Sequence, residues 1–574
     1  MNVAEMIVEM LEEIGVERVY GIVGDSLNGL TEAIRRRGKI EWVHMRHEEA
    51  AAFAAGAEAQ VTGRLAVCAG SCGPGNLHLI NGLYDCHRSG APVLAIAAQI
   101  PSAEIGSGYF QETKPERLFA DCSHYCEMVS SPEQMPRTLE LALRAAIGKG
   151  GVSVLTIPGD VALKDAPKVK AAPAPGLVPA RPRTVPAHDD LDRLAAMLNE
   201  AGSVTLLCGR GCRDAHAELL QLADALGAPI VHALGGKDFV EHDNPFDVGM
   251  TGLIGFSSGY RAMLRCDMLL MLGTDFPYRQ FYPERARIAQ IDIRPDHLGR
   301  RCPLDLGLVG DVGDSLRELL PRLDRKTDRA HLDDSLAHYR KARADLDSLA
   351  VDRPTEGPIH PQYLARLIDE AAAQDCLFTA DVGTPTIWAA RYLRMNGRRR
   401  LIGSWVHGSM ANAMTQAIGL QAANAGRQVV SLSGDGGFAM LMGDFLTLVQ
   451  HDLPVKVIVF NNGTLGFVEM EMKAAGLLET GVSLRNPDFA AMARAVGIHG
   501  VRVEKPAELP AAVANILASP GPALLDVVVA RQELAMPPKV TAEQLKGFSL
   551  YVLKAVMNGR GDEIVDLART NLLR

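Results

Sequence analysis

The sequence lacks several features that would narrow its function at once. Its 574 residues contain no apolar run long enough to span a bilayer, which argues against an integral membrane protein. Acidic residues outnumber basic ones by 68 to 59, so the net charge of −9 excludes an electrostatic footprint for nucleic acid. The first residues, MNVAEMIVEMLEEIG, predict an acidic amphipathic helix without the pattern of an export signal, and we expect a cytoplasmic protein.

The ten cysteines also lack a metal-binding pattern. Six of them form C-x3-C pairs, whereas zinc ribbons use C-x2-C spacing, and no histidine set completes a site. The pairs are Cys68/Cys72, Cys122/Cys126 and Cys208/Cys212. Because free cysteine is among the most buried residue types, we expect small buried thiols beside strands and turns, without metal or disulfide.

Short apolar runs alternate with amphipathic segments of helix length along the chain. The runs end at Gly, Pro or Asp, as in LAVCAG (65–70), SVTLLCGRG (203–211) and VVSLSGDGG (429–437). Alternation of this kind is typical of parallel sheets covered by helices on both faces. The predicted fold class is therefore α/β, with three doubly wound parallel-sheet domains and a C-terminal amphipathic helical tail.

Two segments without apolar periodicity divide the chain. The stretch 164–185 is rich in proline and predicts an extended linker. The stretch 324–359 is strongly charged and predicts a connecting segment. The predicted domains and tail are 1–163, 186–323, 360–530 and 531–574.

The turn SGDGG (433–437) places a carboxylate in a glycine turn between a strand and a helix. Such turns usually bind phosphate, which a carboxylate repels. The next predicted strand, VKVIVF, ends at Asn461-Asn462, and the ends of two parallel strands joined by a crossover helix lie on one sheet edge. Asp435 and Asn462 can therefore meet around Mg²⁺ or Ca²⁺, which would bridge the protein to a diphosphate. The structural alternative is a helix N-cap at Asp435 and an asparagine turn.

This combination of GDG and NN resembles the signature of thiamine-diphosphate enzymes. The resemblance implies that Mg²⁺ is held by Asp435, Asn462 and the backbone carbonyl of Thr464. The cofactor also needs a carboxylic acid at its pyrimidine N1′ in a dry pocket. Glu48 in RHEEAAAF matches, because the family's glutamate directly follows a His or Asn. An acidic residue in the first turn of a helix is otherwise ordinary complementarity to the helix dipole.

Further segments match the family in order. CGPGNLHLINGLYD (72–85) resembles the loop beside the pyrimidine, and HGSMANAM (407–414) carries the apolar residue that props the cofactor in its bent form. The resemblance implies that Glu471 is an active-site acid, that Phe467 shields or links the cofactors, and that Phe110 and Gln111 form a substrate-side pair; a core aromatic is the alternative for Phe467. The implied cofactor contacts are Val382, Gly383, Thr384, Gly408, Ser409, Met410, Asp435, Gly436, Gly437, Asn462, Gly463, Thr464, Leu465, Gly466, Phe467 and Val468.

Segments of the middle domain resemble the FAD-binding elements of flavin-containing thiamine enzymes. They are CGRGC (208–212), MTGLIGF (250–256), GTDFPYRQFYP (273–283) and IDIRP (291–295). Each alone could be an ordinary strand and turn, and the series in family order predicts FAD. The implied contacts are Thr251, Gly252, Leu253, Ile254, Thr274, Asp275, Phe276, Pro277, Tyr278 and Asp292.

The whole chain is similar to the bacterial quinone-dependent pyruvate dehydrogenases, also called pyruvate oxidases. This resemblance implies oxidative decarboxylation of pyruvate to acetate and CO₂, with electrons passing through FAD to a membrane quinone (ubiquinone). It also implies a homotetramer in which Glu48 of one chain meets a neighbour's metal site. The alternatives are an acetolactate synthase-like carboligase with structural FAD, a phosphate- and oxygen-dependent pyruvate oxidase, and an inactive scaffold, which would need neither Glu48, Asp435 nor Asn462.

The tail contains apolar residues at helical spacing, namely Leu545, Phe548, Val552 and Val556, and Tyr551 suits a membrane interface. Amphipathic helices also pack onto their own protein, which is the alternative. The resemblance implies that the tail binds a phospholipid surface, so that the protein associates peripherally with the inner face of the cell membrane.

Overall fold

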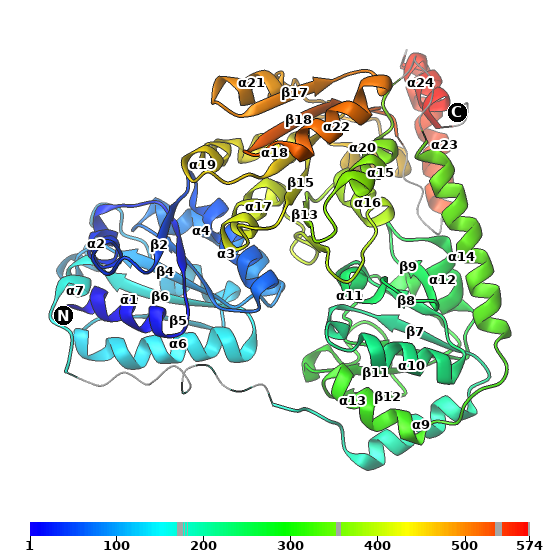
Figure 1. Ribbon diagram of the computed structural model, residues 1–574, viewed down its shortest axis with the longest axis horizontal. Helices are drawn as coiled ribbons and strands as arrows, with labels where there is room; N and C mark the ends of the chain where they lie inside the picture. Colours follow the sequence, from blue (N-terminus) through cyan, green and yellow to red (C-terminus); the bar gives the residue numbers. More distant parts are fainter. Residues whose placement is uncertain are drawn as a thin grey trace.

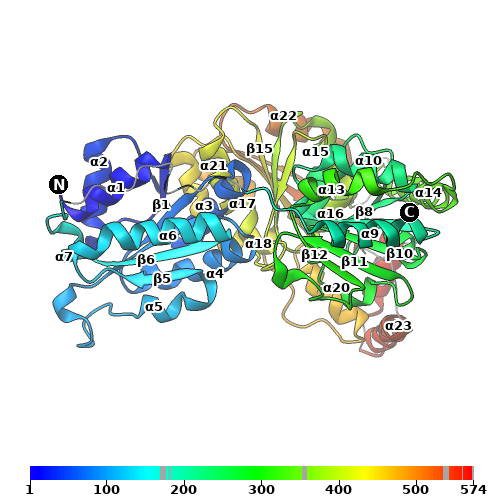
Figure 2. The same cartoon turned by 90° about the horizontal axis from the view of Figure 1, so that it is seen from below.

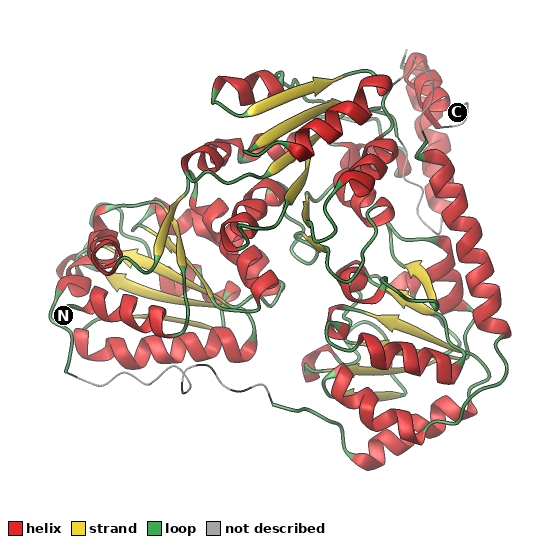
Figure 3. Ribbon diagram, viewed as in Figure 1, coloured by secondary structure: helices red, strands yellow, loops and turns green. Residues whose placement is uncertain are grey.

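The structure is a computed structural model that describes residues 1–168, 182–351, 358–533, 542–558 and 560–571, with the single residues 176, 178 and 180. It contains three α/β bodies, each built on a sheet of six parallel strands (Figure 1, Figure 3), which confirms the predicted fold class. Residues 169–175, 177, 179 and 181 of the predicted linker, 352–357 of the charged segment, and 534–541, 559 and 572–574 of the tail lie outside the described residues. The predicted domain limits stay predictions.

The first sheet has the strand order β2-β1-β3-β4-β6-β5. Three of its inner strands are buried at every residue, because helices cover both faces. Its strands are β1 (Arg18–Gly21), β2 (Glu41–His44), β3 (Ala66–Gly70), β4 (Val93–Gln99), β5 (Tyr125–Met128) and β6 (Val152–Pro158). Its helices are α1 (Val3–Glu13), α2 (Asn28–Arg37), α3 (Glu48–Thr62), α4 (Pro74–Arg88), α5 (Pro115–Leu118), α6 (Met135–Lys149) and α7 (Gly159–Leu163).

The third sheet, β14-β13-β15-β16-β18-β17, repeats the strand order of the first. Its strands are β13 (Leu377–Ala380), β14 (Arg400–Ile402), β15 (Val429–Gly434), β16 (Lys456–Asn461), β17 (His499–Val503) and β18 (Ala523–Val528). Its helices are α15 (Pro361–Ala371), α16 (Thr384–Tyr392), α17 (Asn412–Ala423), α18 (Asp435–Met440), α19 (Phe445–Gln450), α20 (Gly466–Ala474), α21 (Phe489–Ala495) and α22 (Leu509–Ala518). The order reverses between β13 and β15, and parallel sheets bind ligands at such switch points.

The middle sheet has a different order, β9-β8-β7-β10-β11-β12, which is the order of dinucleotide-binding folds, with its switch point between β7 and β10. Its strands are β7 (Val204–Cys208), β8 (Ile230–His232), β9 (Asp247–Met250), β10 (Met268–Leu272), β11 (Arg287–Asp292) and β12 (Leu306–Val309). Its helices are α9 (His188–Glu200), α10 (His216–Leu226), α11 (Lys237–Val240), α12 (Ser257–Leu264), α13 (Val312–Leu319) and α14 (Ala330–Leu349), the last within the predicted charged segment.

Helices α3 and α17 join the first and third bodies, and they lie side by side in Figures 1 and 2. Every residue of α3 from Ala50 to Gln60 is buried, and its alanines share one hydrophobic core with Met414, Ala417 and Ile418 of α17. Small side chains let the two backbones approach, since a Cβ at Gly419 would overlap the carbonyl oxygen of Ala54. The Ala-rich sequence of α3 thus serves contact between domains.

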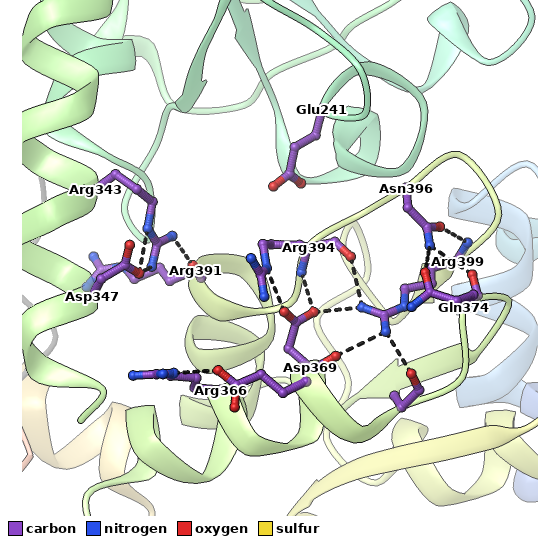
Figure 4. A network of polar contacts seen from close by, with 12 residues as sticks. Glu241, Arg343, Asp347, Arg366, Asp369, Gln374, Arg391, Arg394, Asn396 and Arg399 are labelled. Carbon is purple, nitrogen blue, oxygen red and sulfur yellow. Dashed lines mark hydrogen bonds and ion pairs between the residues drawn. The ribbon is translucent and has the colours of Figure 1, made fainter. Parts of the chain in front are cut away.

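A polar network inside the third body lies beside the middle body, and Arg391 extends from this region to the middle body (Figure 4). Asp369 on α15 accepts hydrogen bonds from Arg394 Nε at 2.7 Å and from Arg399 Nη1 at 2.8 Å. Arg391 of α16 reaches across to the middle body, where its Nε donates to the carbonyl oxygen of Ile254 at 3.0 Å. Glu241 of the middle body lies over the same region in Figure 4. These contacts set the predicted FAD segment beside the third body.

The tail forms α23 (Ala542–Met557) and α24 (Gly561–Asn571), and α23 packs on α20. Tyr551 is only 1% exposed and lies beneath the Lys473 ammonium, 5.3 Å from the ring centre, so it is not available for the membrane interface that its sequence context favours. The opposite face of α23 exposes Leu545, Leu553 and Val556. None of the helices that the structure describes has the length and apolarity to cross a membrane.

All ten cysteines are free thiols, and eight of them are buried, which confirms the expected burial. Burial raises the pKa of the Cys68 and Cys122 thiols to about 12. Thiols with raised pKa values are poor nucleophiles at neutral pH, so these cysteines serve packing.

Candidate active site

Asp435 follows β15 directly as the first residue of α18, and it is 3% exposed. Its Oδ2 accepts hydrogen bonds from Gly463 N and Asn486 Nδ2, both at 2.7 Å, and its Oδ1 accepts from Gly436 N at 2.9 Å. Burial raises the pKa of Asp435, although these donors oppose the shift. The turn after β16 therefore meets the turn after β15, as the parallel pairing of the strands requires.

The second turn carries Asn462 and Thr464. Asn462 Oδ1 accepts from the Thr464 backbone N–H at 3.1 Å, and the Thr464 hydroxyl donates to Glu469 Oε2 at 2.6 Å. Glu469 in turn pairs with Lys473 at 2.6 Å, and both side chains are 3% exposed. The buried Glu469–Lys473 ion pair on α20 thus fixes this turn through the hydrogen bond from Thr464 to Glu469.

The residues present suit Mg²⁺. A carboxylate, an amide oxygen and a backbone carbonyl are hard ligands that this ion prefers. Asp435 forms no ion pair with any residue in the described part of the chain, and a buried carboxylate needs a compensating cation. The described part of the chain shows no cluster of three or more His, Cys, Asp or Glu side chains able to hold a metal.

The predicted diphosphate turn, 382–384, lies between β13 and α16 at the switch point. Gly383 has φ 137°, a conformation that favours glycine, and Thr384 opens α16, so backbone N–H groups and the helix dipole face the turn. Asp381 braces it by accepting from Ala413 N at 3.0 Å and Gly434 N at 3.1 Å. Burial raises the pKa of Asp381 to about 7.

The remaining predicted contacts of the third body converge on the same edge. A Cβ at Gly436 would lie 2.8 Å from Leu465 and 3.4 Å from the Met410 methyl group. A Cβ at Gly466 would lie 2.7 Å from Asn462 Nδ2 and 3.3 Å from Thr384. The turns around Gly383, Met410, Asp435 and Asn462 therefore form one constellation, although their roles stay predictions.

Glu48 opens α3 in the first body and is 6% exposed. His47 caps this helix, and its Nδ1 accepts from Glu49 N at 3.2 Å. The Glu48 carboxylate lies 2.9 Å from Nδ1 of His78 on α4, and the His78 ring stacks on His47 with centroids 4.4 Å apart. The predicted catalytic acid is thus held by the PGN loop and its helix.

Phe110 and Gln111 lie in a loop next to the start of α4. Phe110 is 76% exposed, while Gln111 Oε1 accepts a weak hydrogen bond from the Cys72 thiol at 3.4 Å. No hydrogen bond or ion pair among the described residues joins Glu48 to Asp435 or Asn462 of its own chain. Polar contacts do join the two bodies nearby, since Asn81 Nδ2 of α4 donates to the Ser409 hydroxyl at 2.8 Å. The structure therefore assembles two half-sites, and the described residues show no polar contact that links Glu48 to the two metal-site turns.

The predicted FAD contacts gather at the edge of the middle sheet. Gly211 N donates to the carbonyl oxygen of Gly273 at 3.0 Å, which joins the turns after β7 and β10. The Thr251 hydroxyl is buried without a hydrogen-bond partner among the described residues, as a ligand-binding group would be. Asp275, by contrast, is engaged by Arg301 Nε at 2.7 Å. Asp292 ends β11 and accepts from Arg294 N at 2.9 Å. The joined turns after β7 and β10 and the unpaired Thr251 hydroxyl suit the binding of a dinucleotide.

Helix α20 begins within the predicted thiamine diphosphate contacts and carries Phe467, Val468 and Glu471. Phe467 is partly buried against the core of the third body, while Glu471 and Val468 are exposed. The pKa of Tyr278 in the middle body is raised by burial and by the charge of Glu471, which places these side chains near each other. The acid predicted for catalysis is thus close enough to the predicted flavin segment for its charge to act on Tyr278.

Sequence reasoning missed four residues of this site, namely His78, Asp381, Asn486 and Glu469. Asp381 directly precedes the predicted turn 382–384 at the end of an apolar strand, and this position could have indicated a residue of the site. His78 belongs to the matched PGN segment. Asn486 carries no sequence signal, because its contact depends on how a loop folds back. Glu469 stands four residues before Lys473, which is the spacing of an ion pair on one helix and would have been a usable signal.

Comparison with known families covers most of the chain. Residues 1–118 match the N-terminal TPP binding domain of thiamine pyrophosphate enzymes, residues 191–319 the central domain, and residues 381–527 the C-terminal TPP binding domain. The three matches fall on the three sheets.

Individual relatives belong to the same class of enzyme-like proteins as the domain matches indicate. YdaP of Bacillus subtilis, described as a thiamine pyrophosphate-containing protein, is 39% identical over 98% of this chain and 97% of its own. Pyruvate oxidase of Lactiplantibacillus plantarum is 31% identical over 91% of this chain and 88% of its own. Acetolactate synthase 1 of Oryza sativa is 31% identical over 93% of this chain and 85% of its own. The chain belongs to the thiamine diphosphate-dependent enzymes related to pyruvate oxidase and acetolactate synthase.

Proposed function

We propose that this enzyme decarboxylates pyruvate oxidatively and passes the electrons through FAD to a membrane quinone, ubiquinone. Pyruvate, water and quinone are consumed, and acetate, carbon dioxide and quinol are formed. The observation that carries the proposal is helix α23, which packs on α20 and leaves a second apolar face, with Leu545, Leu553 and Val556, exposed. Exposed apolar surface of this kind is typical of protein or membrane contact.

Within this proposal each chemical task of the reaction falls to a residue of the chain. Bound thiamine diphosphate supplies the nucleophilic carbon for decarboxylation. Asp435, Asn462 and the Thr464 carbonyl hold Mg²⁺, and the 382–384 turn binds the diphosphate. Glu48 holds a proton at the pyrimidine N1′, and His78, at 2.9 Å, orients its carboxyl group.

The middle domain holds FAD at the switch point between β7 and β10 in this proposal. Its strand order and the unpaired Thr251 hydroxyl support a dinucleotide there. Glu471 and Phe467 on α20 would lie between FAD and thiamine diphosphate, where Phe467 shields or links them.

The active enzyme is a homo-oligomer, and we propose a tetramer, in which Glu48 of one chain completes the metal site of another. The absence of polar contacts between Glu48 and Asp435 among the described residues of one chain supports this arrangement. The tail would attach the cytoplasmic enzyme peripherally to the inner face of the cell membrane, and its apolar face would lie in the lipid interface.

The test follows the flavin absorbance without oxygen. Purified enzyme with thiamine diphosphate and Mg²⁺ receives pyruvate, and we expect bleaching that quinone in phospholipid vesicles reverses. An oxidised flavin with acetolactate as product would overturn the proposal in favour of a carboligase. Reoxidation by oxygen with acetyl phosphate as product would favour the phosphate-dependent oxidase.

A further inference from the structure

A cavity of about 380 Å³ opens where the three domains meet. Val61 at the end of α3 lines it from the first domain, Gly397 and Arg400 from the third, and the middle domain contributes Arg213 and Phe239 among others. None of these residues belongs to the predicted thiamine diphosphate or FAD contacts. Pockets of roughly 300–1,000 Å³ hold small ligands. The cavity therefore has room for a ligand of its own.

Two arginines in its wall stand against one aromatic ring. The guanidinium of Arg213 lies 5.2 Å from the centre of the Phe239 ring, and that of Arg400 lies 4.8 Å from it. Asp238 holds Arg400 by accepting from its Nε at 2.9 Å, and it also accepts from Leu401 N at 3.1 Å. A guanidinium fixed against a ring keeps its in-plane N–H groups available, which suits planar recognition of anions.

The charge of Arg213 has no ion-pair partner within the described ranges, and its Nη2 donates to the Gln60 carbonyl oxygen at 2.9 Å. Burial, together with the like charges of Arg400 and Arg210, lowers the pKa of Arg213 to about 10, although Asp214 and Asp238 act in the opposite direction. An anion in the cavity would offset the repulsion among these guanidinium groups.

Two histidines of the wall carry unused polar atoms. The rings of His216 and His242 stack with centroids 3.9 Å apart. His216 Nδ1 lies 3.0 Å from the Phe239 carbonyl oxygen, so Nδ1 donates and Nε2 is left as an acceptor. His216 Nε2 and His242 Nδ1 are buried without hydrogen-bond partners among the described residues. Such atoms commonly bind water or a ligand, which is a second sign of a polar ligand.

We propose that this cavity binds a single phosphate group, either free or carried by a small phosphorylated metabolite. Guanidinium groups match phosphate oxygens in geometry and charge, and a hydrogen phosphate has an O–H that can donate to an unprotonated imidazole. The carboxylates of Asp214 and Asp238 in the same wall disfavour ligands with several phosphates. Because three domains line the cavity, phosphate binding also stabilises their arrangement. This site is independent of the proposed electron acceptor.

The test uses the enzyme loaded with thiamine diphosphate, Mg²⁺ and FAD, so that the probe cannot enter the diphosphate site. Isothermal titration calorimetry measures binding of inorganic phosphate and, in a second arm, of glycerol 3-phosphate. Arg213→Gln should weaken binding about tenfold or more, because a charge-assisted hydrogen bond is lost. Arg193→Gln, on the exposed helix α9 with Asp190 as partner, is the matched control and should change binding less than about twofold.

Tighter binding of glycerol 3-phosphate than of phosphate would identify a phosphorylated metabolite as the ligand, and the reverse would identify free phosphate. A second variant, Val61→Glu, adds a carboxylate to the wall and leaves every arginine in place, so it should also weaken binding about tenfold. Equal phosphate affinity in native enzyme and both cavity variants, or no binding by native enzyme, would overturn the proposal.

Discussion

Replacing Lys473 by methionine should destabilise the third domain by about 3 kcal/mol. Lys473 Nζ donates to Glu469 Oε1 and to Gln532 Oε1, both at 2.6 Å, and it lies over the Tyr551 ring. Methionine keeps the length of the side chain and can pack on the ring, but it removes the charge. The Glu469 carboxylate then stays buried without its main partner.

The magnitude follows from what remains around Glu469. Breaking a buried ion pair by removing one partner costs about 3–5 kcal/mol. Glu469 keeps the Thr464 hydroxyl at 2.6 Å and the more distant Arg531 at 3.5 Å, so the low end of this range applies. Lys473→Met combined with Glu469→Gln leaves no buried charge in the pair and should cost less than Lys473→Met alone.

The same pair predicts a pH dependence. Burial opposes ionisation of Glu469, but hydrogen bonds from Lys473 and Thr464 and the charge of Arg531 outweigh it, so the pKa of Glu469 is lowered. A carboxyl group with a lowered folded pKa contributes stability above its unfolded pKa of about 4.3, and this stability is lost as the pH falls through the folded value. Glu469→Gln should therefore show a smaller loss of stability below about pH 4.

Urea unfolding followed by tryptophan fluorescence is a suitable assay, because Trp388 and Trp405, two of the three tryptophans, lie in the third domain. The urea midpoint of this transition compares the stability of Lys473→Met, Glu469→Gln and the double variant. A cost below about 1 kcal/mol for Lys473→Met, which is typical of exposed pairs, would refute the reasoning. So would a double variant less stable than Lys473→Met.

Three further outcomes are expected. Asp435→Asn removes the buried anion and should weaken Mg²⁺-dependent thiamine diphosphate binding at least about 100-fold by calorimetry, while exposed Asp189→Asn should not; equal affinities would contradict the metal site. Glu48→Gln should keep cofactor affinity within about threefold and abolish CO₂ release, and retained activity would count against its role. Gly547→Leu should detach α23 from α20, because even a Cβ at this position would overlap the Ala474 carbonyl oxygen. We expect faster proteolysis of the tail and more enzyme bound to phospholipid vesicles. Unchanged protease resistance would speak against docking at Gly547.

Local pattern in the sequence was enough to predict the fold class and the convergence of two turns. Apolar periodicity reports which residues face a core, and the rule that parallel strands end on one edge then brings the turn at Asp435 to that of Asn461–Gly463. Both arguments use short-range information and a strongly constrained topology. They needed no knowledge of which domains touch.

Contacts between distant segments were decided by the tertiary structure. Asn486 reaches Asp435 only because the loop before α21 folds back over the turn, and nothing in its neighbours indicates this. Tyr551 sits in a helix that is apolar on two faces, and the sequence could not tell which face α20 covers. The strand order of the middle sheet and the cavity beside Phe239 likewise depend on chain crossings and domain packing, which local periodicity does not encode. The sequence determines which chemical groups the side chains carry, but the packing of elements far apart in the chain determines which groups they contact.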